Sequence, residues 1–267
     1  MRRSEAAIME LEICVESVES AMAAEEGGAQ RIELCSDLLE GGITPSAGLI
    51  QVVRKQVDFG IFVMIRPRGG DFFYTDYEFE MMRQDVVQAR KLGADGVVLG
   101  LLDVDGHVDI ARTRELVELA HPMQVTFHRA FDMSADMDES LSRVVTAGAH
   151  RILTSGGRKS IGEGAERVAS LVRAAKDRIG IMVAGGIRLG NIEAIAARTG
   201  AAEFHCSLKT RIDSPVRFRK PDVNLGETAA DEFARFAVLK DDVRALRAEM
   251  DQIESASTGK TSTGSRG

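Results

Sequence analysis

The sequence contains no apolar run that approaches the roughly 20 residues needed for a membrane-spanning helix. Near the amino terminus, Arg2 and Arg3 are not followed by an apolar segment, so we expect no secretory signal. Basic residues form no block and the formal net charge is −7, which argues against a nucleic-acid partner. We therefore expect a cytoplasmic protein that engages neither membranes nor nucleic acids.

Cysteine is scarce, with three residues in 267, and no Cys-x-x-Cys pair or zinc-type Cys/His spacing occurs. An odd number of cysteines suits a reducing compartment better than a framework of disulfide bonds. The chain is 44% hydrophobic and 28% charged, which suffices for one large globular core.

Strand-like and helix-like patterns alternate strictly along the chain, eight of each. The expected strands are 9–15, 30–35, 61–66, 95–100, 123–128, 150–154, 179–184 and 202–207. The expected helices are 17–27, 46–57, 76–92, 109–120, 134–147, 162–176, 189–199 and 231–253. Such alternation predicts right-handed βαβ units and a parallel sheet, and eight units favour a (β/α)8 TIM barrel. An open doubly wound sheet is the alternative, but the turn after the first strand lacks its usual glycines.

The domain boundaries follow from this pattern. We expect an amino-terminal extension at 1–8, a single barrel domain at 9–254, and a disordered tail rich in Ser, Thr and Gly at 255–267. The last predicted helix has apolar residues at heptad-like spacing: Phe236, Leu239, Val243, Leu246, Met250 and Ile253. This face either packs on the barrel or forms a subunit contact in a homo-oligomer.

Two short segments, 11–14 and 32–35, have nearly the same sequence and the two-residue period of a strand. If their Leu and Ile residues face the helices, then Glu12, Cys14, Glu33 and Cys35 all face the barrel interior. A buried carboxylate is costly unless it is paired or used, so these residues mark the first place to look for function.

The same alternation places polar side chains inside three further strands. It predicts that Met64 and Arg66 face inward, and likewise Thr126 and His128, and His205 and Ser207, whereas Cys206 faces outward. Strands four, six and seven cannot be phased in this way. An interior with two His, two Glu and an Arg favours a functional cavity, for acid–base chemistry or metal binding, over a purely structural polar network.

The loops that follow the strands add further candidates, because barrel active sites form at that end. Arg66 and Arg68 flank a proline and precede two glycines, a pattern that suits either an anion grip or a charged surface loop. Other candidate pocket residues are Asp103, Asp132, Ser155, Gly185 and Gly186. Asp132 pairs with Arg129 or orients His128, and the Gly-Gly pair offers backbone N–H groups to a phosphate.

Seven segments together resemble the CutC copper homeostasis family: 11–14, 31–35, 40–46, 65–72, 102–106, 126–132 and 153–157. The similarity extends from about residue 9 to residue 250. The resemblance implies a cytoplasmic, oligomeric (β/α)8 barrel with a Cu(I) site at Cys14 and Cys35. Thiolates are soft ligands, which are the kind that Cu(I) prefers.

Three functional hypotheses remain open at this point. The first is a copper-binding protein with Cys14 and Cys35 as metal ligands. The second is an enzyme that acts on a small phosphorylated or carboxylated substrate. Its candidate catalytic residues are Glu12, Glu33 and His128, and its candidate substrate-binding residues are Arg66, Arg68, Asp103, Asp132, Ser155, Gly185, Gly186 and His205. The third is a scaffold whose last helix makes subunit contacts.

Overall fold

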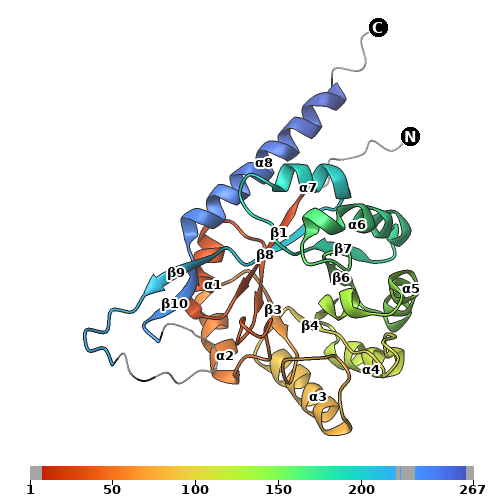
Figure 1. Ribbon diagram of the computed structural model, residues 1–267, viewed down its shortest axis with the longest axis horizontal. Coiled ribbons are helices and arrows are strands. Elements are labelled where there is room, and N and C mark those ends of the chain that lie inside the picture. Colours follow the sequence, from red (N-terminus) through yellow and green to blue (C-terminus); the bar gives the residue numbers. More distant parts are fainter. Residues whose placement is uncertain (1–7, 221–222, 224–231, 263–267) are drawn as a thin grey trace.

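Eight parallel strands close into a barrel in sequence order, with helices around the outside (Figure 1). The computed structural model describes residues 8–220, 223 and 232–262, with side chains described as far as residue 256. The strands are β1 (Glu10–Val15), β2 (Arg31–Leu34), β3 (Gly60–Met64), β4 (Gly96–Leu99), β5 (Gln124–Phe127), β6 (Arg151–Thr154), β7 (Gly180–Val183) and β8 (Glu203–Cys206). The pairing of β1 with β8 closes the sheet, which confirms the predicted (β/α)8 barrel over the open sheet.

The surrounding helices follow the strands in turn. They are α1 (Val18–Glu26), α2 (Ala47–Gln56), α3 (Asp76–Lys91), α4 (Ile110–Ala120), α5 (Met137–Ala147), α6 (Ile161–Ala175), α7 (Ile192–Thr199) and α8 (Lys240–Ser262), with a short 3-10 helix η1 (Arg129–Met133) after β5. Side-chain oxygens cap several helix starts; Thr75 and Glu78, for example, form a reciprocal capping box at α3. Gly148 and Gly200 end α5 and α7 in the left-handed conformation that glycine adopts most readily.

Side chains alternate across the barrel wall as a two-residue period requires. Leu11, Ile13, Ile32 and Leu34 are fully buried in the core between strands and helices. Cys14, Cys35, Phe62, Met64 and Val98 form a separate cluster inside the barrel. This arrangement also orients two of the strands that the sequence left open, because Leu153 of β6 and Met182 of β7 cluster together inside the barrel.

The last part of the chain differs from the expected helix at 231–253. Ala234–Val238 forms a strand, β10, which pairs antiparallel with β9 (Lys209–Asp213) outside the barrel, and α8 begins only at Lys240 (Figure 1). The helix prediction was therefore wrong for the described residues before Lys240. The reason is that, as a strand, this segment pairs its backbone N–H and C=O groups with those of β9.

The apolar series of the predicted helix is divided by this change. Val243, Leu246 and Met250 are fully buried, in a helix that lies against α1 and α7, whereas Phe236 and Leu239 are 45% and 39% exposed. Within 240–250 the apolar face of the helix thus packs on the barrel, which is one of the two possibilities that the sequence left open. The helix continues to Ser262, so helix occupies 255–262, where we expected a disordered tail; residues 263–267 lie outside the described chain. Among the helices described, none combines the length and the apolar character that a membrane span requires.

Candidate functional site

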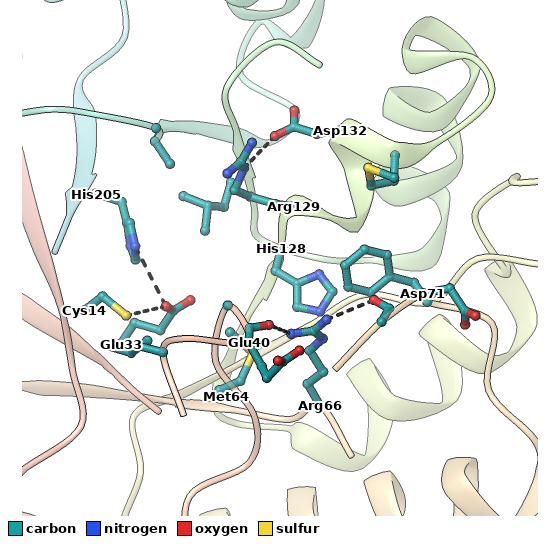
Figure 2. A pocket seen from close by; sticks show the side chains of 18 of the residues that line it. Cys14, Glu33, Glu40, Met64, Arg66, Asp71, His128, Arg129, Asp132 and His205 are labelled. Atoms are coloured by element: carbon teal, nitrogen blue, oxygen red, sulfur yellow. Dashed lines mark hydrogen bonds and ion pairs between the residues drawn. The ribbon is translucent and has the colours of Figure 1, made fainter. Parts of the chain in front are cut away.

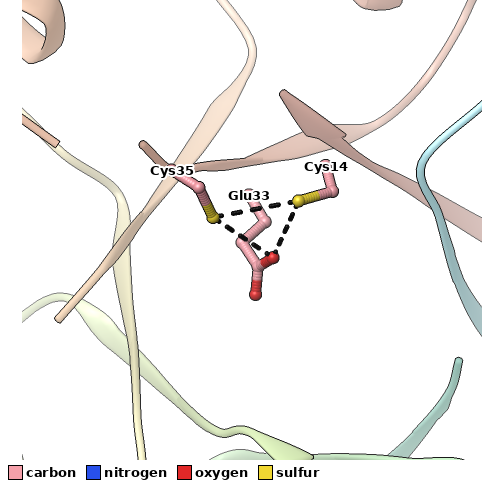
Figure 3. A group of neighbouring side chains, drawn as sticks. All are labelled: Cys14, Glu33 and Cys35. Atoms are coloured by element: carbon pink, nitrogen blue, oxygen red, sulfur yellow. Dashed lines mark hydrogen bonds between the residues drawn. The ribbon is translucent and has the colours of Figure 1, made fainter. Parts of the chain in front are cut away.

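Two thiol groups meet inside the barrel near the carboxyl ends of β1 and β2 (Figure 3). Cys14 lies opposite Glu33 in the strand register, and Cys35 directly follows β2, where its N–H group donates to the carbonyl of Val15. The two Sγ atoms are 3.8 Å apart, and both cysteines are buried and free. Glu33 Oε2 lies 3.1 Å from Cys14 Sγ and 3.5 Å from Cys35 Sγ. The two repeated segments thus place both thiols and one carboxyl group in a single compact cluster.

The charge of this cluster is concentrated on one sulfur. The hydrogen bond from Cys35 lowers the pKa of Cys14 to about 5, against the opposing effect of burial, and His205 lowers it further. Burial raises the pKa of Glu33 well above its usual value, and the neighbouring Cys14 raises it more. Burial also raises the pKa of Cys35. Within this cluster the pKa shifts favour a thiolate at Cys14 and the protonated forms of Cys35 and Glu33.

A charged pair lies beside the thiols. His205 Nδ1 is 2.7 Å from Glu12 Oε1, and Arg31 Nε donates to Glu12 Oε2 over 2.6 Å. Against the effect of burial, the hydrogen bond from His205 and the charge of Arg31 lower the pKa of Glu12 to about 2. The charge of Glu33 and hydrogen bonds to Cys14 and Glu12 raise the pKa of His205 well above its usual value, although burial opposes this. The pair is thus an imidazolium and a carboxylate, and it presents positive charge to the Cys14 thiolate.

The floor of the barrel is built from two arginines that the sequence analysis did not identify. Arg31 and Arg151 are both buried, both pair with Glu203, and their guanidinium carbons lie 5.5 and 5.4 Å from the Phe62 ring centroid. A signal for Arg31 was present, because it stands two residues before Glu33 and so has the same inward parity. The interior below the thiols is therefore occupied by a paired ionic network.

A cavity of about 960 Å³ opens among the loops that follow the strands (Figure 2). Nine of the predicted site residues line it: Cys14, Glu33, Arg66, Asp103, His128, Asp132, Gly185, Gly186 and His205. Glu12 and Cys35 have no exposed surface and lie behind this lining. Of the two thiols, Cys14 is consequently the one that a ligand in the cavity would meet.

One wall of the cavity carries Arg66 and His128, which lie near each other (Figure 2). The Arg66 guanidinium group donates to the backbone carbonyls of Glu40, Gly42 and Gly70, so it holds two loops together. Burial and the charge of Arg66 lower the pKa of His128 to about 3, which keeps the imidazole neutral. Arg66 thus supplies the fixed positive charge of this wall and His128 supplies an uncharged imidazole.

The Asp132 carboxylate is used within the protein. It accepts hydrogen bonds from the Thr154 hydroxyl group, from the N–H and hydroxyl groups of Ser155 and from the Gly157 N–H group, and it pairs with Arg129 Nε at 2.8 Å. Of the two roles considered for it, pairing with Arg129 is the one the structure shows. Asp132 and Ser155 therefore fix the loop after β6.

Two further candidates are also committed to loop structure. Asp103 lines the cavity, but its Oδ1 atom accepts hydrogen bonds from the N–H groups of Asp105 and His107, as in an aspartate turn. Arg68 pairs with Glu78 and Asp71 and is not part of the cavity lining. Of the two arginines considered for an anion site or a charged surface loop, Arg66 lines the cavity and Arg68 does not. Gly185 and Gly186 line it with φ values of 98° and 94°.

Two groups of side chains have the composition of a metal site. The potential ligand atoms of Cys14, Glu33 and Cys35 lie within 4.8 Å of one another, and so do those of Glu12, Glu33 and His205. The second group contains the Glu12–His205 ion pair, so a cation there would have to displace the imidazolium proton. The first group offers two soft sulfur atoms and is the better candidate for a soft metal ion.

Comparison with known proteins gives a consistent result. The CutC family model matches residues 9–210. A CutC family protein from Chromobacterium violaceum is 48% identical over 242 residues, which cover 91% of this chain and 98% of the relative. A human protein named copper homeostasis protein cutC homolog is 50% identical over 216 residues, or 81% of this chain and 79% of the relative.

Solved structures agree. One from Streptococcus agalactiae, named as a copper homeostasis protein CutC, is 33% identical with a TM-score of 0.70, over 74% of this chain and 98% of that one. A thiamine phosphate pyrophosphorylase from Pyrococcus furiosus is 17% identical with a TM-score of 0.55, over 93% of this chain and 98% of that one, which shows a shared fold only. The chain belongs to the CutC family.

Proposed function

We propose that this protein binds Cu(I) through the Sγ atoms of Cys14 and Cys35. The observation that carries the proposal is the 3.8 Å separation of two buried, free thiols on neighbouring strands. Sulfur ligands select Cu(I) over harder cations. The human and mouse relatives are named for copper homeostasis, which supports the same function here.

The spacing of the sulfurs suits an ion that keeps further ligand positions. If metal–sulfur bonds are about 2.3 Å long, as in zinc sites, a linear ion holds two sulfurs about 4.6 Å apart, a trigonal ion about 4.0 Å apart and a tetrahedral ion about 3.8 Å apart. The observed 3.8 Å is far from the linear value. The remaining positions then face Glu33 Oε2 or the cavity, where a ligand can reach them.

The electrostatics suit a monovalent cation. Cys14 is already a thiolate, and Cys35 releases its proton when the metal binds. The resulting complex of one Cu(I) ion and two thiolates has a charge of −1, and His205, whose pKa is raised, lies beside it in its pair with Glu12. We place this activity in the cytoplasm, where thiols remain reduced.

The alternative, an enzyme acting on a small anionic substrate, is not favoured, because the relatives are named for copper homeostasis and not for a reaction.

We further propose that the chain forms a homo-oligomer. Exposed apolar side chains on and near the β9–β10 hairpin support this, namely Val216, Phe218, Phe236 and Leu239. Sedimentation equilibrium tests it, and a monomer at micromolar concentration contradicts it.

Anaerobic Cu(I) titration against a competing chelator tests the copper proposal. We expect one tightly bound ion per chain in the unaltered protein and loss of this binding in Cys14→Ser and in Cys35→Ser. Cys206→Ser is the matched control, because Cys206 is also buried but lies in the core that faces the helices. Binding that survives both substitutions, or is lost equally in the control, refutes the proposal.

A further inference from the structure

A basic segment leaves the barrel at the end of β9. Residues 209–220 contain five basic residues and one acidic residue, in a chain whose formal net charge is −7. The part that follows β9, residues 214–220, is called the arm here; it extends beyond α1 and away from the barrel axis (Figure 1). Every residue of the arm after Ser214 is exposed. The arm therefore gains little burial from its own barrel and is placed to contact another molecule.

The arm combines apolar and basic side chains. Phe218 is 77% exposed and Val216 is 53% exposed. Within the described part of the chain, Arg217 and Lys220 form no salt bridge. A partner that matches the arm must therefore offer apolar side chains and carboxylates together.

One contact gives the arm a defined conformation. Arg219 donates to the Ser214 carbonyl group over 3.2 Å, and its guanidinium carbon lies 4.6 Å from the centroid of the Phe233 ring. An arginine face that stacks on an aromatic ring is attracted to it. Arg219 thus holds the arm against the returning chain of the hairpin, which reduces the entropy that the arm loses when it binds a partner.

A surface of matching chemistry borders one side of the cavity mouth. The loops after β2, β3 and β4 each carry one exposed large apolar side chain and at least one exposed carboxylate. This surface is called the rim here, and its residues are Leu39, Glu40, Asp71, Phe73, Val104 and Asp105. Four of them also line the cavity, namely Glu40, Asp71, Phe73 and Val104. A segment bound to the rim would therefore lie at the cavity mouth.

The rim carries negative charge that the barrel does not neutralise. Segments 35–46 and 100–109, which supply two of its three loops, contain no Lys or Arg. In the third loop, Arg68 is already paired with Glu78 and Asp71. Glu40 and Asp105 form no salt bridge with any residue that the structure describes. Two free carboxylates on the rim thus match two free cations on the arm, and complementary charges of this kind select a partner.

The position of the arm favours a second copy of the chain as its partner. Lys209, at the start of β9, lies beside the loop after β2, where its Nζ atom is 3.5 Å from the Leu38 carbonyl oxygen. The arm thus originates next to its own rim but leads away from it. In a twofold pair the same contact is made in both directions, which requires that the base of the arm and the rim lie close together. A nucleic acid is the less favoured partner, because the acidic chain repels phosphates.

We propose that the arm of one copy lies on the rim of a second copy, with Phe218 against the apolar side chains and with Arg217 and Lys220 beside the carboxylates. The second arm makes the same contact in return. A partner side chain then forms part of the mouth of the cavity that contains Cys14. The inference rests on the proposed homo-oligomer and is independent of copper binding.

Cross-linking between two different variants tests the contact. One variant carries Phe218→Cys and is isotope-labelled, and the other carries Val104→Cys. After the subunits have exchanged, we expect a short bis-maleimide to link positions 218 and 104 across two copies, as identified by mass spectrometry. The unaltered protein, whose three cysteines are buried, is the blank.

Leu189→Cys in place of Val104→Cys is the matched control. Leu189 is 56% exposed and lies on the loop after β7, so it belongs to the same face of the barrel but not to the rim. We expect its linkage to position 218 to be at least about tenfold weaker, because the two thiols have a lower effective concentration.

Sedimentation equilibrium measures what the arm contributes to association. We expect Phe218→Ser to raise the Kd between copies at least about tenfold, because an aromatic anchor is lost from the interface. Arg217→Glu should also raise this Kd, and more strongly at low salt than at high salt. Leu189→Ser is the control, and we expect its Kd to stay within about twofold of that of the unaltered protein.

The outcomes separate this inference from the two proposals above. An oligomer without the linkage between positions 218 and 104, or with an unchanged Kd in Phe218→Ser, overturns the arm contact alone. A monomer overturns both the arm contact and the homo-oligomer, and binding of a fluorescent oligothymidylate by that monomer would assign the arm to nucleic acid instead. Cys35→Ser should abolish Cu(I) binding but leave the linkage intact, because Cys35 has no exposed surface.

Discussion

The Nδ1 atom of His205 lies 2.7 Å from Oε1 of Glu12, a carboxylate with no exposed surface. Arg31 approaches the other oxygen of the same carboxylate at 2.6 Å. Glu12, His205 and Arg31 thus form a row of buried charges. Each charge is stabilised by its charged neighbours, so the loss of one leaves another uncompensated. These residues connect the barrel floor to the thiol cluster, and His205 adds to the lowering of the pKa of Cys14 that the hydrogen bond from Cys35 produces.

Removal of the Glu12 charge should destabilise the fold strongly. Glu12→Gln leaves Arg31 and His205 without their shared anion, and we expect a loss of about 3–5 kcal/mol in the free energy of unfolding. Urea denaturation measures this. Glu10→Gln is the control: Glu10 also pairs with Arg31, but its side chain is 44% exposed, so we expect a loss of about 1 kcal/mol or less. Equal losses of unfolding free energy in the two variants would show that burial of the carboxylate does not determine the loss.

Acid should weaken the protein through His128. The pKa of His128 is about 3 in the native state, against an ordinary value of 6.5, because burial and Arg66 disfavour the charged form. Between these values the unfolded chain binds a proton that the native chain does not, so stability falls as pH falls from 6.5 towards 3. The slope is roughly 1.4 kcal/mol per pH unit over that interval. Denaturation of His128→Asn at several pH values should show this slope removed.

The Cys14 thiol should react as a thiolate at unusually low pH. Its pKa of about 5 predicts that alkylation by iodoacetamide, a molecule small enough for the cavity, reaches half its maximal rate near pH 5. Cys35→Ala should raise that midpoint, because the hydrogen bond from Cys35 is the largest cause of the shift. Mass spectrometry identifies the alkylated residue. A midpoint near the ordinary thiol value in the unaltered protein would contradict the charge assignment.

Two glycines of α6 should respond in opposite ways to alanine. A Cβ atom at Gly164 would lie 1.8 Å from the Ser155 carbonyl oxygen, so Gly164→Ala must push α6 away from the loop after β6. At Gly162 the nearest atom is 3.7 Å away, and Gly162→Ala should stabilise the helix by up to about 1 kcal/mol. Thermal unfolding of both variants provides the comparison. A tolerated Gly164→Ala would mean that the helix and the loop can separate freely.

Strand periodicity predicted the interior of the barrel well. The repeated Leu/Ile and Glu/Cys alternation placed Cys14 and Cys35 on the inside, and the structure shows them there. The distance between their sulfurs depends on strand register and on the position of Cys35 just beyond β2, neither of which a periodic pattern contains. Sequence reasoning therefore identified the two thiols but could not give their separation.

The loop residues were harder to assign, because a side chain there can bind backbone groups that are remote in sequence. The carboxylate of Asp132 accepts from residues 22 to 25 positions away, and Arg66 donates to carbonyls up to 26 positions away. The same limitation affected the segment before α8. The spacing of Phe236 and Leu239 fitted a helical series with Val243. Pairing with the distant β9 instead placed Phe236 in a strand and left Leu239 in the connection to α8.

The final helix is hydrogen-bonded to the very start of the barrel. Glu254 accepts a hydrogen bond from the Met9 N–H group, and Arg247 donates to the Met9 carbonyl group. Because Met9 precedes β1, the strand that closes the barrel against β8, the first strand obtains these partners only after the last helix has been synthesised. During translation these contacts can thus form only after residue 254 has been synthesised, later than β8 becomes available to pair with β1, and a nascent chain that stops before Glu254 lacks the hydrogen bond to the Met9 N–H group.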